Sequence, residues 1–370
     1  MRLFHTSDTH LGHQQFSRTD ASGLNQREQD HAAAFQAVVD AAVAEKPDLF
    51  IHAGDLFDGV RPSNRALAQA MHGFWALSRA GIPVVVIAGN HEHPKLRDTG
   101  SPLSLFTDIP GVHVAYKGSP ETFAFRVGGR ALHVHAVPQM ESAQALGQAI
   151  TALPRGPPDL HVLAVHGAVT TVAVVHHGEF NELSIEPSWL EGFDYVALGH
   201  YHGLQEVLPT AWYCGAPERA SIAEAAQEKG FLEVTLGAQA AVRFRPLPAR
   251  PYVDLPAIDG TGRDGPDILA EARAAISAAP AGAVVRQRIR NVDARLRGGL
   301  DLRSLQEAGR HLLHLDLSRI EWQDTRHDVA GVQTIGPLAS EFEAFVAKTP
   351  LAGVDRPTLL ALARSVLEAP

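Results

Sequence analysis

Three short apolar runs near the start of the chain alternate with two segments in which apolar residues recur at helical spacing. The runs at residues 3–6, 49–53 and 84–88 each end in a polar or glycine-containing stretch, which is typical of buried strands. The segments between them have apolar residues on one helical face: Phe35, Val38, Val39, Ala42 and Val43 in the first, and Leu67, Met71, Phe74 and Leu77 in the second. This alternation predicts a layered α/β domain.

Later in the chain, strand candidates are more frequent and helical patterns fewer. The candidates lie at residues 131–137, 160–165, 195–198, 231–236 and 241–244. We expect a mixed, partly antiparallel second half that ends near the turn-rich stretch 256–266, which gives a first domain of 1–257. Helix and strand patterns alternate again over 267–335, which predicts a small α/β capping domain. Residues 336–370 contain two apolar helical patterns, which we expect to pack onto this unit.

The predicted capping domain has an arginine-rich strand at residues 284–292. Arg286, Arg288 and Arg290 alternate at every second position, so their side chains should project from one face. This face is either an ordinary solvated surface or one that contacts phosphates. Arg61, in a loop that follows the second strand, has the same two interpretations.

The composition indicates a globular protein, since 45% of the 370 residues are hydrophobic. No apolar run approaches the roughly 18 residues that a membrane span needs, and no signal-peptide pattern is present, so we expect a cytoplasmic protein. Cys214 is the single cysteine, which excludes an internal disulfide. The net charge of -9 is unfavourable for holding nucleic acid, so contact with DNA would need local basic patches or bound cations.

Clusters of polar residues follow the ends of the predicted strands. Asp8 and His10 follow the first strand, and residues i and i+2 of an extended chain point to the same side. The later strands end in further candidates, namely Asp55 and Asp58, Asn90 and His91, His166, and the pair His200 and His202. Open α/β sheets gather ligand sites at the carboxyl ends of their strands, so these side chains should converge in one crevice.

Aspartate, histidine and asparagine without a thiolate favour hard or borderline divalent cations. We expect two Mn²⁺ ions, with Mg²⁺, Fe²⁺ or Zn²⁺ as alternatives. Two such ions about 4 Å apart can share a bridging carboxylate and a hydroxide that attacks phosphorus in line. The predicted chemistry is therefore hydrolysis of a phosphate ester without a covalent intermediate.

The motifs SDTH, GDLFD, GNHE, HG and GHYH, in this order, resemble those of the calcineurin-like metallophosphoesterases. The resemblance implies the fold of that family, in which layered mixed β-sheets are flanked by helices. It also implies a ligand set: Asp8, His10 and His202 for the first metal, Asn90, His166 and His200 for the second, and Asp55 as the bridge. His91 would be the catalytic histidine that binds no metal.

The position of His91 directly after Asn90 predicts its role. With Asn90 turned toward a metal, the imidazole of His91 can face the substrate and protonate the leaving oxygen. Asp58 is expected to accept a hydrogen bond from this imidazole and to fix its tautomer. Some relatives have histidine in place of Asp58, and many have aspartate in place of Glu92.

Three longer phrases, HTSDTHLGH, GDLFDGVRPS and FDYVALGHYH, resemble the SbcD-type nucleases of DNA double-strand-break repair and their relatives. The resemblance implies a Mn²⁺-dependent exonuclease and endonuclease that acts on DNA ends, a capping domain and a partner ATPase of the SbcC type. It also implies a homodimer. We expect the helix at residues 64–79 to form the interface, because Leu67, Met71, Phe74 and Trp75 give it a broad apolar surface.

Two other functions stay open at this point. A phosphodiesterase or phosphatase for a small-molecule or phosphoprotein substrate would use the same metals. However, the phosphatase signature has arginine directly after the second aspartate of the GD motif, where this chain has Gly59. A catalytically silent binding module is disfavoured because every expected ligand is present. Hydrolysis of an aryl phosphodiester, followed by a test on linear duplex DNA, discriminates among the three.

Overall fold

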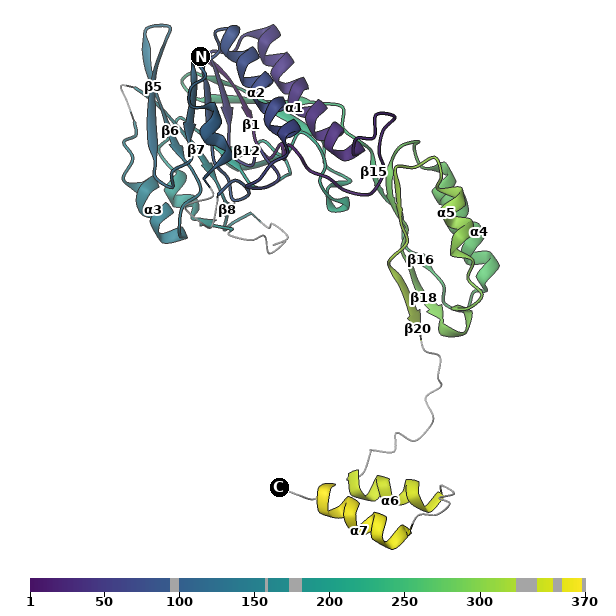
Figure 1. The fold of residues 1–370 in the computed structure, drawn as a ribbon. Helices are drawn as coiled ribbons and strands as arrows, with labels where there is room; N and C mark the ends of the chain where they lie inside the picture. The colour runs from purple at the N-terminus through teal and green to yellow at the C-terminus, as the bar shows by residue number, and fades with distance from the viewer. Residues whose placement is uncertain (94–99, 157–158, 173–181, 324–337, 349–354, 368–370) are drawn as a thin grey trace.

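The computed structural model describes residues 1–93, 100–156, 159–172, 182–323, 338–348 and 355–367. Two six-stranded sheets pack face to face in the unit that contains the N-terminus, the two-sheet unit (Figure 1). The first sheet has the order β14 (Ala240–Pro246), β13 (Gly230–Leu236), β1 (Arg2–Thr6), β2 (Leu49–His52), β3 (Val84–Ile87) and β4 (Val112–Ala115). The second has the order β11 (Gln205–Leu208), β12 (Ala211–Tyr213), β10 (Tyr195–Gly199), β7 (Leu160–His166), β6 (Arg130–Val137) and β5 (Glu121–Val127).

Parallel strands make up the larger part of both sheets, and antiparallel pairs lie at one end of the first sheet and at both ends of the second. Strands β1 to β4 are parallel to one another, whereas β13 pairs antiparallel with β1 and with β14. In the second sheet, β6, β7, β10 and β12 are parallel, and β5 and β11 are the antiparallel edges. The mixed, layered α/β architecture predicted from the sequence is confirmed.

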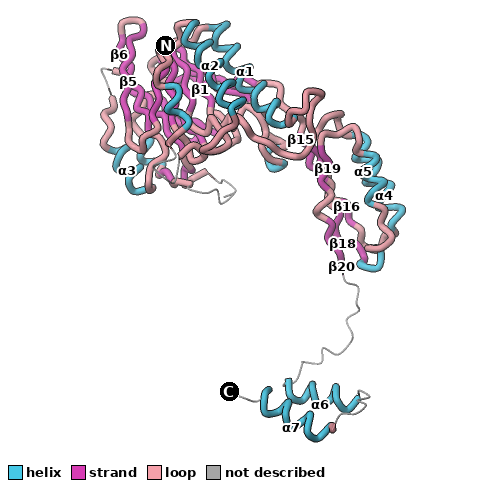
Figure 2. Tube along the Cα trace, in the orientation of Figure 1, coloured by secondary structure: helices cyan, strands magenta, loops and turns pink. Residues whose placement is uncertain are grey.

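Helices cover the outer faces of the two sheets, as Figure 2 shows. Helices α1 (Gln26–Glu45) and α2 (Asn64–Arg79) pack on the first sheet, and α3 (Ala143–Thr151) packs on the second. The side chain of Asn25 caps α1 by accepting from two main-chain N–H groups, and Ser63 caps α2 through the N–H of Ala66. In β1, Leu3 points into the layer between the sheets, whereas Phe4 points toward the helices.

A second unit has its own core and lies beside the two-sheet unit (Figure 1). Helices α4 (Gly265–Ala278) and α5 (Leu302–Ala308) pack there on two small parallel sheets, and this part of the chain is the α4–α5 unit. The sheets are β15 (Tyr252–Asp254), β17 (Val284–Arg286) and β19 (His314–Asp316), and β16 (Ile258–Asp259), β18 (Ile289–Asp293) and β20 (Ile320–Gln323). The boundaries at residues 257 and 267 stay predictions, but β15 and β16 favour an earlier start for this unit.

The single strand predicted at residues 284–292 is wrong, because β17 ends at Arg286 and β18 begins only at Ile289. The chain breaks where the fully buried side chain of Gln287 donates to the main-chain carbonyls of Pro256 and Arg288. A buried amide needs such partners.

At the C-terminal end, α6 (Leu338–Lys348) and α7 (Arg356–Leu367) form a hairpin. Glu343 of α6 accepts from Arg364 of α7 at 2.6 Å. In Figure 1 the hairpin stands apart from the α4–α5 unit, whereas the sequence predicted that it packs there. None of the helices in the described ranges is long and apolar enough to cross a membrane.

Candidate metal centre

The carboxyl ends of five parallel strands bring the predicted ligands together. The loops after β1 and β2 run side by side, because Asp8 N donates to Gly54 O at 3.0 Å and His10 N donates to Asp55 O at 3.1 Å. Several of the candidate ligands have a left-handed backbone, with φ of 53° at Asp8, 43° at His10 and 52° at Asp55. Non-glycine residues seldom adopt this conformation, and it is typical of functional turns.

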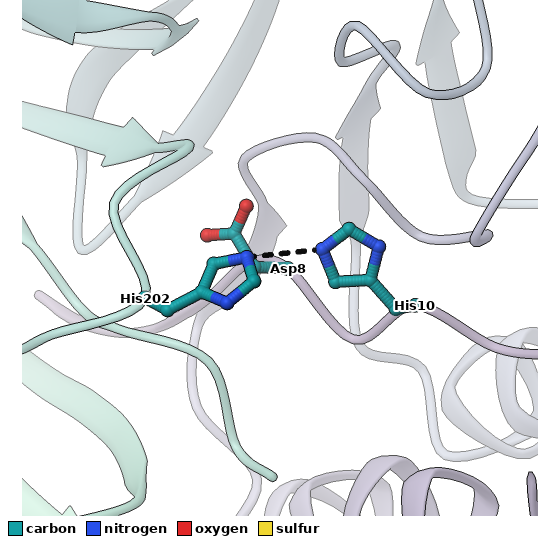
Figure 3. A group of neighbouring side chains, drawn as sticks. All are labelled: Asp8, His10 and His202. Carbon is teal, nitrogen blue, oxygen red and sulfur yellow. Dashed lines mark hydrogen bonds between the residues drawn. The ribbon is translucent and has the colours of Figure 1, made fainter. Parts of the chain in front are cut away.

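The first group consists of Asp8, His10 and His202, whose ligand atoms all lie within 4.8 Å of one another (Figure 3). Nε2 of His10 lies 3.1 Å from Nε2 of His202. The carboxylate of Asp8 is buried and accepts from the main-chain N–H of His200 at 3.0 Å and from the hydroxyl of Ser7. Two facing imidazole nitrogens beside a buried carboxylate fit one divalent cation.

Asp55 lies between the first group and a second one. Its Oδ2 is 3.2 Å from Nε2 of His166 and 3.9 Å from Nε2 of His10. The ligand atoms of Asp8, Asp55 and His166 also lie within 4.8 Å of one another. The side-chain oxygen of Asn90 is 2.9 Å from Nε2 of His166 and 3.3 Å from Nδ1 of His200. A carboxylate in this position can serve two adjacent cations.

Two glycines allow this close approach. A Cβ atom at Gly89 would lie 2.2 Å from Oδ1 of Asp55, and one at Gly54 would lie 2.4 Å from Nδ1 of His166. Gly54 also has a φ of 95°, which L side chains rarely adopt. The glycines of the GD and GN motifs are therefore required by the packing of the ligands themselves.

The ligands polarise one another. Burial raises the pKa of Asp55, but the charge and hydrogen bond of His166 outweigh it, so the pKa falls well below its usual range. Burial lowers the pKa of His166, but the charge of Asp55 prevails and raises it to about 9. Burial and the charge of Asp55 raise the pKa of Glu92 to about 8, although Glu92 accepts from the N–H groups of Phe57 at 2.7 Å and Gly89 at 3.0 Å. This concentration of shifted groups is typical of a functional site.

His91 lies at the open side of the centre, with Nε2 4.0 Å from Oδ2 of Asp55. Its Nδ1 lies 3.0 Å from the main-chain carbonyl of Asp58. The sequence predicted that the carboxylate of Asp58 would accept this bond. The carboxylate instead turns toward the first loop, where its Oδ1 is 3.0 Å from Nδ1 of His13 and 3.4 Å from Nδ1 of His10.

Sequence reasoning missed the partners that orient the ligand histidines. Nδ1 of His166 lies 2.9 Å from the carbonyl of Ala53, and Nδ1 of His202 lies 3.2 Å from a carboxylate oxygen of Glu224. Each contact leaves Nε2 directed into the centre. Glu224 lies outside all the motifs. No strand-end pattern in the sequence points to it.

The predicted DNA-contacting arginines lie elsewhere, and most have acidic partners. Arg286 donates to both carboxylate oxygens of Asp254, at 3.0 and 2.7 Å, and Arg288 donates to the same carboxylate at 3.2 Å. Arg290 is more exposed and lies 3.6 Å from Glu321. Arg61 is exposed in the loop before α2.

The predicted dimer helix α2 buries part of its apolar surface within the chain. Phe74 is fully buried against the rings of Phe35 and Phe106, and Leu67 and Met71 pack partly on the same core. Trp75 stays exposed, and the nearby 3-10 helix Pro102–Phe106 exposes Leu105. The apolar surface of this region is therefore narrower than the sequence indicated.

A family model described as calcineurin-like phosphoesterase matches residues 1–204. The DNA double-strand break repair protein Mre11 of Saccharolobus solfataricus is 30% identical over 55% of this chain and 49% of its own length. The protein of the same name from Haloferax volcanii is 32% identical over 71% of this chain and 56% of its own length. The chain thus spans about half the length of these relatives. The solved structure of a dimetal phosphatase from Danio rerio is 13% identical, covering 66% of this chain and 96% of its own, with a TM-score of 0.41.

Proposed function

The chain belongs to the calcineurin-like phosphoesterase family, and from this premise we propose that it is a two-metal nuclease that hydrolyses phosphodiester bonds in DNA. One observation carries the proposal. The carboxylate of Asp55 lies between two sets of side chains that each suit one divalent cation. A catalytically silent binding module is disfavoured, because buried ligands that shift one another's pKa values are typical of an active site.

The family's fold implies a centre of two metal ions, and the donor atoms of this chain fit it. The proposed ligands are Asp8, His10 and His202 for one ion, Asn90, His166 and His200 for the other, and Asp55 for both. The absence of thiolate and the mixture of oxygen and nitrogen donors support Mn²⁺. When bound, the two cations supply an activated water and neutralise charge on the phosphate.

His91 is proposed to act on the substrate. The main-chain carbonyl of Asp58 holds Nδ1, which leaves Nε2 at the open side of the centre. From there a protonated imidazole donates its proton to the leaving oxygen or stabilises the charged phosphorane. The carboxylate of Asp58 supports this region through His13 and His10.

DNA is proposed as the substrate because relatives with DNA repair names match 55% and 71% of this chain at 30% and 32% identity. We further propose SbcD-type processing of DNA ends by exonuclease and endonuclease cleavage, in the cytoplasm. Arg61 and the arginines of the α4–α5 unit are the proposed phosphate contacts, which would offset the net charge of -9.

Two protein partners are proposed. An ATPase of the SbcC type would bind the α6–α7 hairpin, which exposes Leu338, Phe345, Leu362 and Val366. A second copy of the chain would bind at α2, where Trp75 and Leu105 are exposed. A monomer by light scattering at micromolar concentration, unchanged by DNA, would exclude the homodimer.

The test of the proposed function has two stages. The purified chain should hydrolyse bis(p-nitrophenyl) phosphate with Mn²⁺ but not with a chelator, and it should then degrade linear duplex DNA under the same conditions. Hydrolysis of the aryl ester without cleavage of DNA would favour a phosphodiesterase or phosphatase for a small-molecule or phosphoprotein substrate. No hydrolysis of either substrate with Mn²⁺, Mg²⁺, Fe²⁺ or Zn²⁺ would favour the binding module.

A further inference from the structure

Glu224 ends the short 3-10 helix η3 (Ile222–Glu224) and lies 22 residues beyond His202 in the chain. Its side chain is almost completely buried, and its Oε1 is 3.2 Å from Nδ1 of His202. The other ring nitrogen of His202, Nε2, faces Nε2 of His10 at 3.1 Å. The two nitrogens of an imidazole have separate partners, and the one that donates a proton is fixed by its acceptor. Glu224 therefore leaves the lone pair of Nε2 directed into the centre.

The carboxylate of Glu224 is itself held on several sides. Oε1 accepts from the main-chain N–H groups of Ala220 and Ser221, both at 3.1 Å. Oε2 accepts from the ammonium group of Lys229, a residue that is also buried. Lys229 donates in addition to the main-chain carbonyl of His202 at 2.9 Å. Both the ring and the backbone of His202 are thus connected to the same buried ion pair.

The electrostatics agree with this geometry. The carboxylate of Glu224 accepts from the ammonium group of Lys229 and from two main-chain N–H groups, and these donors favour its charged form. Burying a carboxylate is costly unless its partners compensate, so an ion pair that served packing alone would be a poor substitute for apolar residues.

The segment that carries Glu224 packs against the second unit. Ile222 and Ala225 pack against Tyr252, Val284 and Leu313, which belong to the α4–α5 unit or to its junction with the two-sheet unit. Glu224 consequently approaches His202 from a segment that is fixed at a domain junction.

We propose that Glu224, held by Lys229, is a positioning residue that presents Nε2 of His202 to the first metal and sets the affinity for that ion. The inference rests on the two-metal function proposed above. Carboxylate partners of ligand histidines fix the ring and increase its basicity, and their loss costs about 10–100-fold in metal affinity.

The test is Glu224→Gln in the full chain, with bound Mn²⁺ measured by equilibrium dialysis. The amide can still accept hydrogen bonds but has no charge. One of the two ions should bind about 10–100-fold more weakly, while the other keeps its affinity. Glu218→Gln is the matched control. Glu218 is equally buried, and its carboxylate accepts hydrogen bonds from Arg27, Arg219 and Arg250, none of which is a proposed ligand.

Lys229→Gln gives an independent second variant in case Glu224→Gln does not fold. It should weaken the same ion by less than about 10-fold, since the carboxylate remains. Parental affinity for both ions in the folded variants, or an equal loss in Glu218→Gln, would overturn the positioning role alone. A parent chain that binds no Mn²⁺ would overturn the proposed metal centre and, with it, this inference.

Discussion

The metal centre and the arginine face of the α4–α5 unit hold charged side chains in opposite ways. In the centre, Asp8 and Asp55 are buried beside histidines, and main-chain N–H groups hold the carboxylates in place. On the second unit, Arg286, Arg288 and Arg290 are partly or largely exposed and lie beside acidic residues of neighbouring strands. Parallel strand ends force the first set together, whereas nothing in the topology directs the second set toward a common ligand.

The two environments predict that substitutions will have effects of different size. Removing one member of a buried, mutually dependent set leaves the others with uncompensated charge, which is costly. Exposed ion pairs contribute about 0–1 kcal/mol and are screened by salt. Substitutions in the centre should therefore have far larger effects than substitutions on the arginine face.

Asp55→Asn should have the largest effect, because Asp55 contacts both ligand groups. We expect no measurable Mn²⁺-dependent turnover of DNA or of an aryl phosphodiester, and fewer than two bound ions per chain. Asp159→Asn is the control, since that carboxylate lies near His133 on the second sheet and is partly exposed. Full activity in Asp55→Asn, or one tightly bound ion per fully active parent chain, would contradict the shared ligand.

His91→Asn should have the second largest effect. The variant is expected to keep both ions and its affinity for DNA but to lose about 10²–10⁴-fold in turnover, the usual contribution of a general acid or base. Asp58→Asn should lose less, because the main-chain carbonyl that holds His91 is unchanged. Stopped-flow cleavage of labelled duplex DNA measures both variants.

An activated aryl ester is the internal control for His91→Asn, since a good leaving group hardly needs protonation. Activity retained on that ester alone would support the general-acid role specifically. Loss of an ion from His91→Asn, or intact cleavage of both substrates, would mean that His91 has another role.

The sequence predicted the sheets and the convergence of the ligands well, for a physical reason. Asp8, Asp55 and Asn90 each follow a short apolar strand, and parallel strands end at one edge of a sheet. Glu224 escaped prediction because it ends a single 3-10 turn and belongs to no periodic pattern. The metal assignments themselves stay predictions until ions are measured.

Prediction failed where one buried polar group redirected the chain. Period-two alternation across residues 284–292 satisfies the pattern of a strand, but Gln287 is buried and donates to the main-chain carbonyl of Pro256, outside that stretch. The carboxylate of Asp58 lies beside the imidazole of His13, whereas the sequence predicted that it would contact His91. The two histidines lie on different loops, and residue spacing does not indicate which of them the carboxylate contacts. Side-chain hydrogen bonds of this kind depend on tertiary neighbours.

Acid should destabilise the two-sheet unit before the α4–α5 unit. Burial lowers the pKa of His5 and of His52 to about 3. Because both values lie below the unfolded value of about 6.5, the unfolded chain binds protons first as the pH falls. The contribution of each histidine to the free energy of unfolding is fully present above about pH 6.5. Below that pH it falls by about 1.4 kcal/mol per pH unit. Hydrogen exchange by segment between pH 7 and pH 5, with a chelator present, measures this.

His5→Gln sharpens the acid prediction, because the amide can keep the bond that His5 makes to the hydroxyl of Tyr195 at 2.8 Å. The variant should lose stability less steeply with falling pH than the parent chain. His72→Gln, at an exposed position of α2, should have the parental slope. Equal slopes in all three chains would show that another group controls acid unfolding.

The smallest effect is expected on the arginine face, where Asp254 provides a test that arginine substitutions alone do not. Arg286 and Arg288 share its carboxylate, so Asp254→Asn frees two cations without moving them far. If this face contacts DNA, the variant should bind duplex DNA a few-fold more tightly, and the slope of log affinity against log salt should steepen by up to about 0.9 per freed arginine.

Replacing Arg286, Arg288 and Arg290 with glutamine should flatten the slope instead. The two variants are therefore expected to change DNA binding in opposite directions. This distinguishes the effect from a general loss of stability, which would weaken binding in both variants. Unchanged affinity and slope in both would identify the face as an ordinary solvated surface, and the centre would then have to hold DNA through Arg61 and the bound cations.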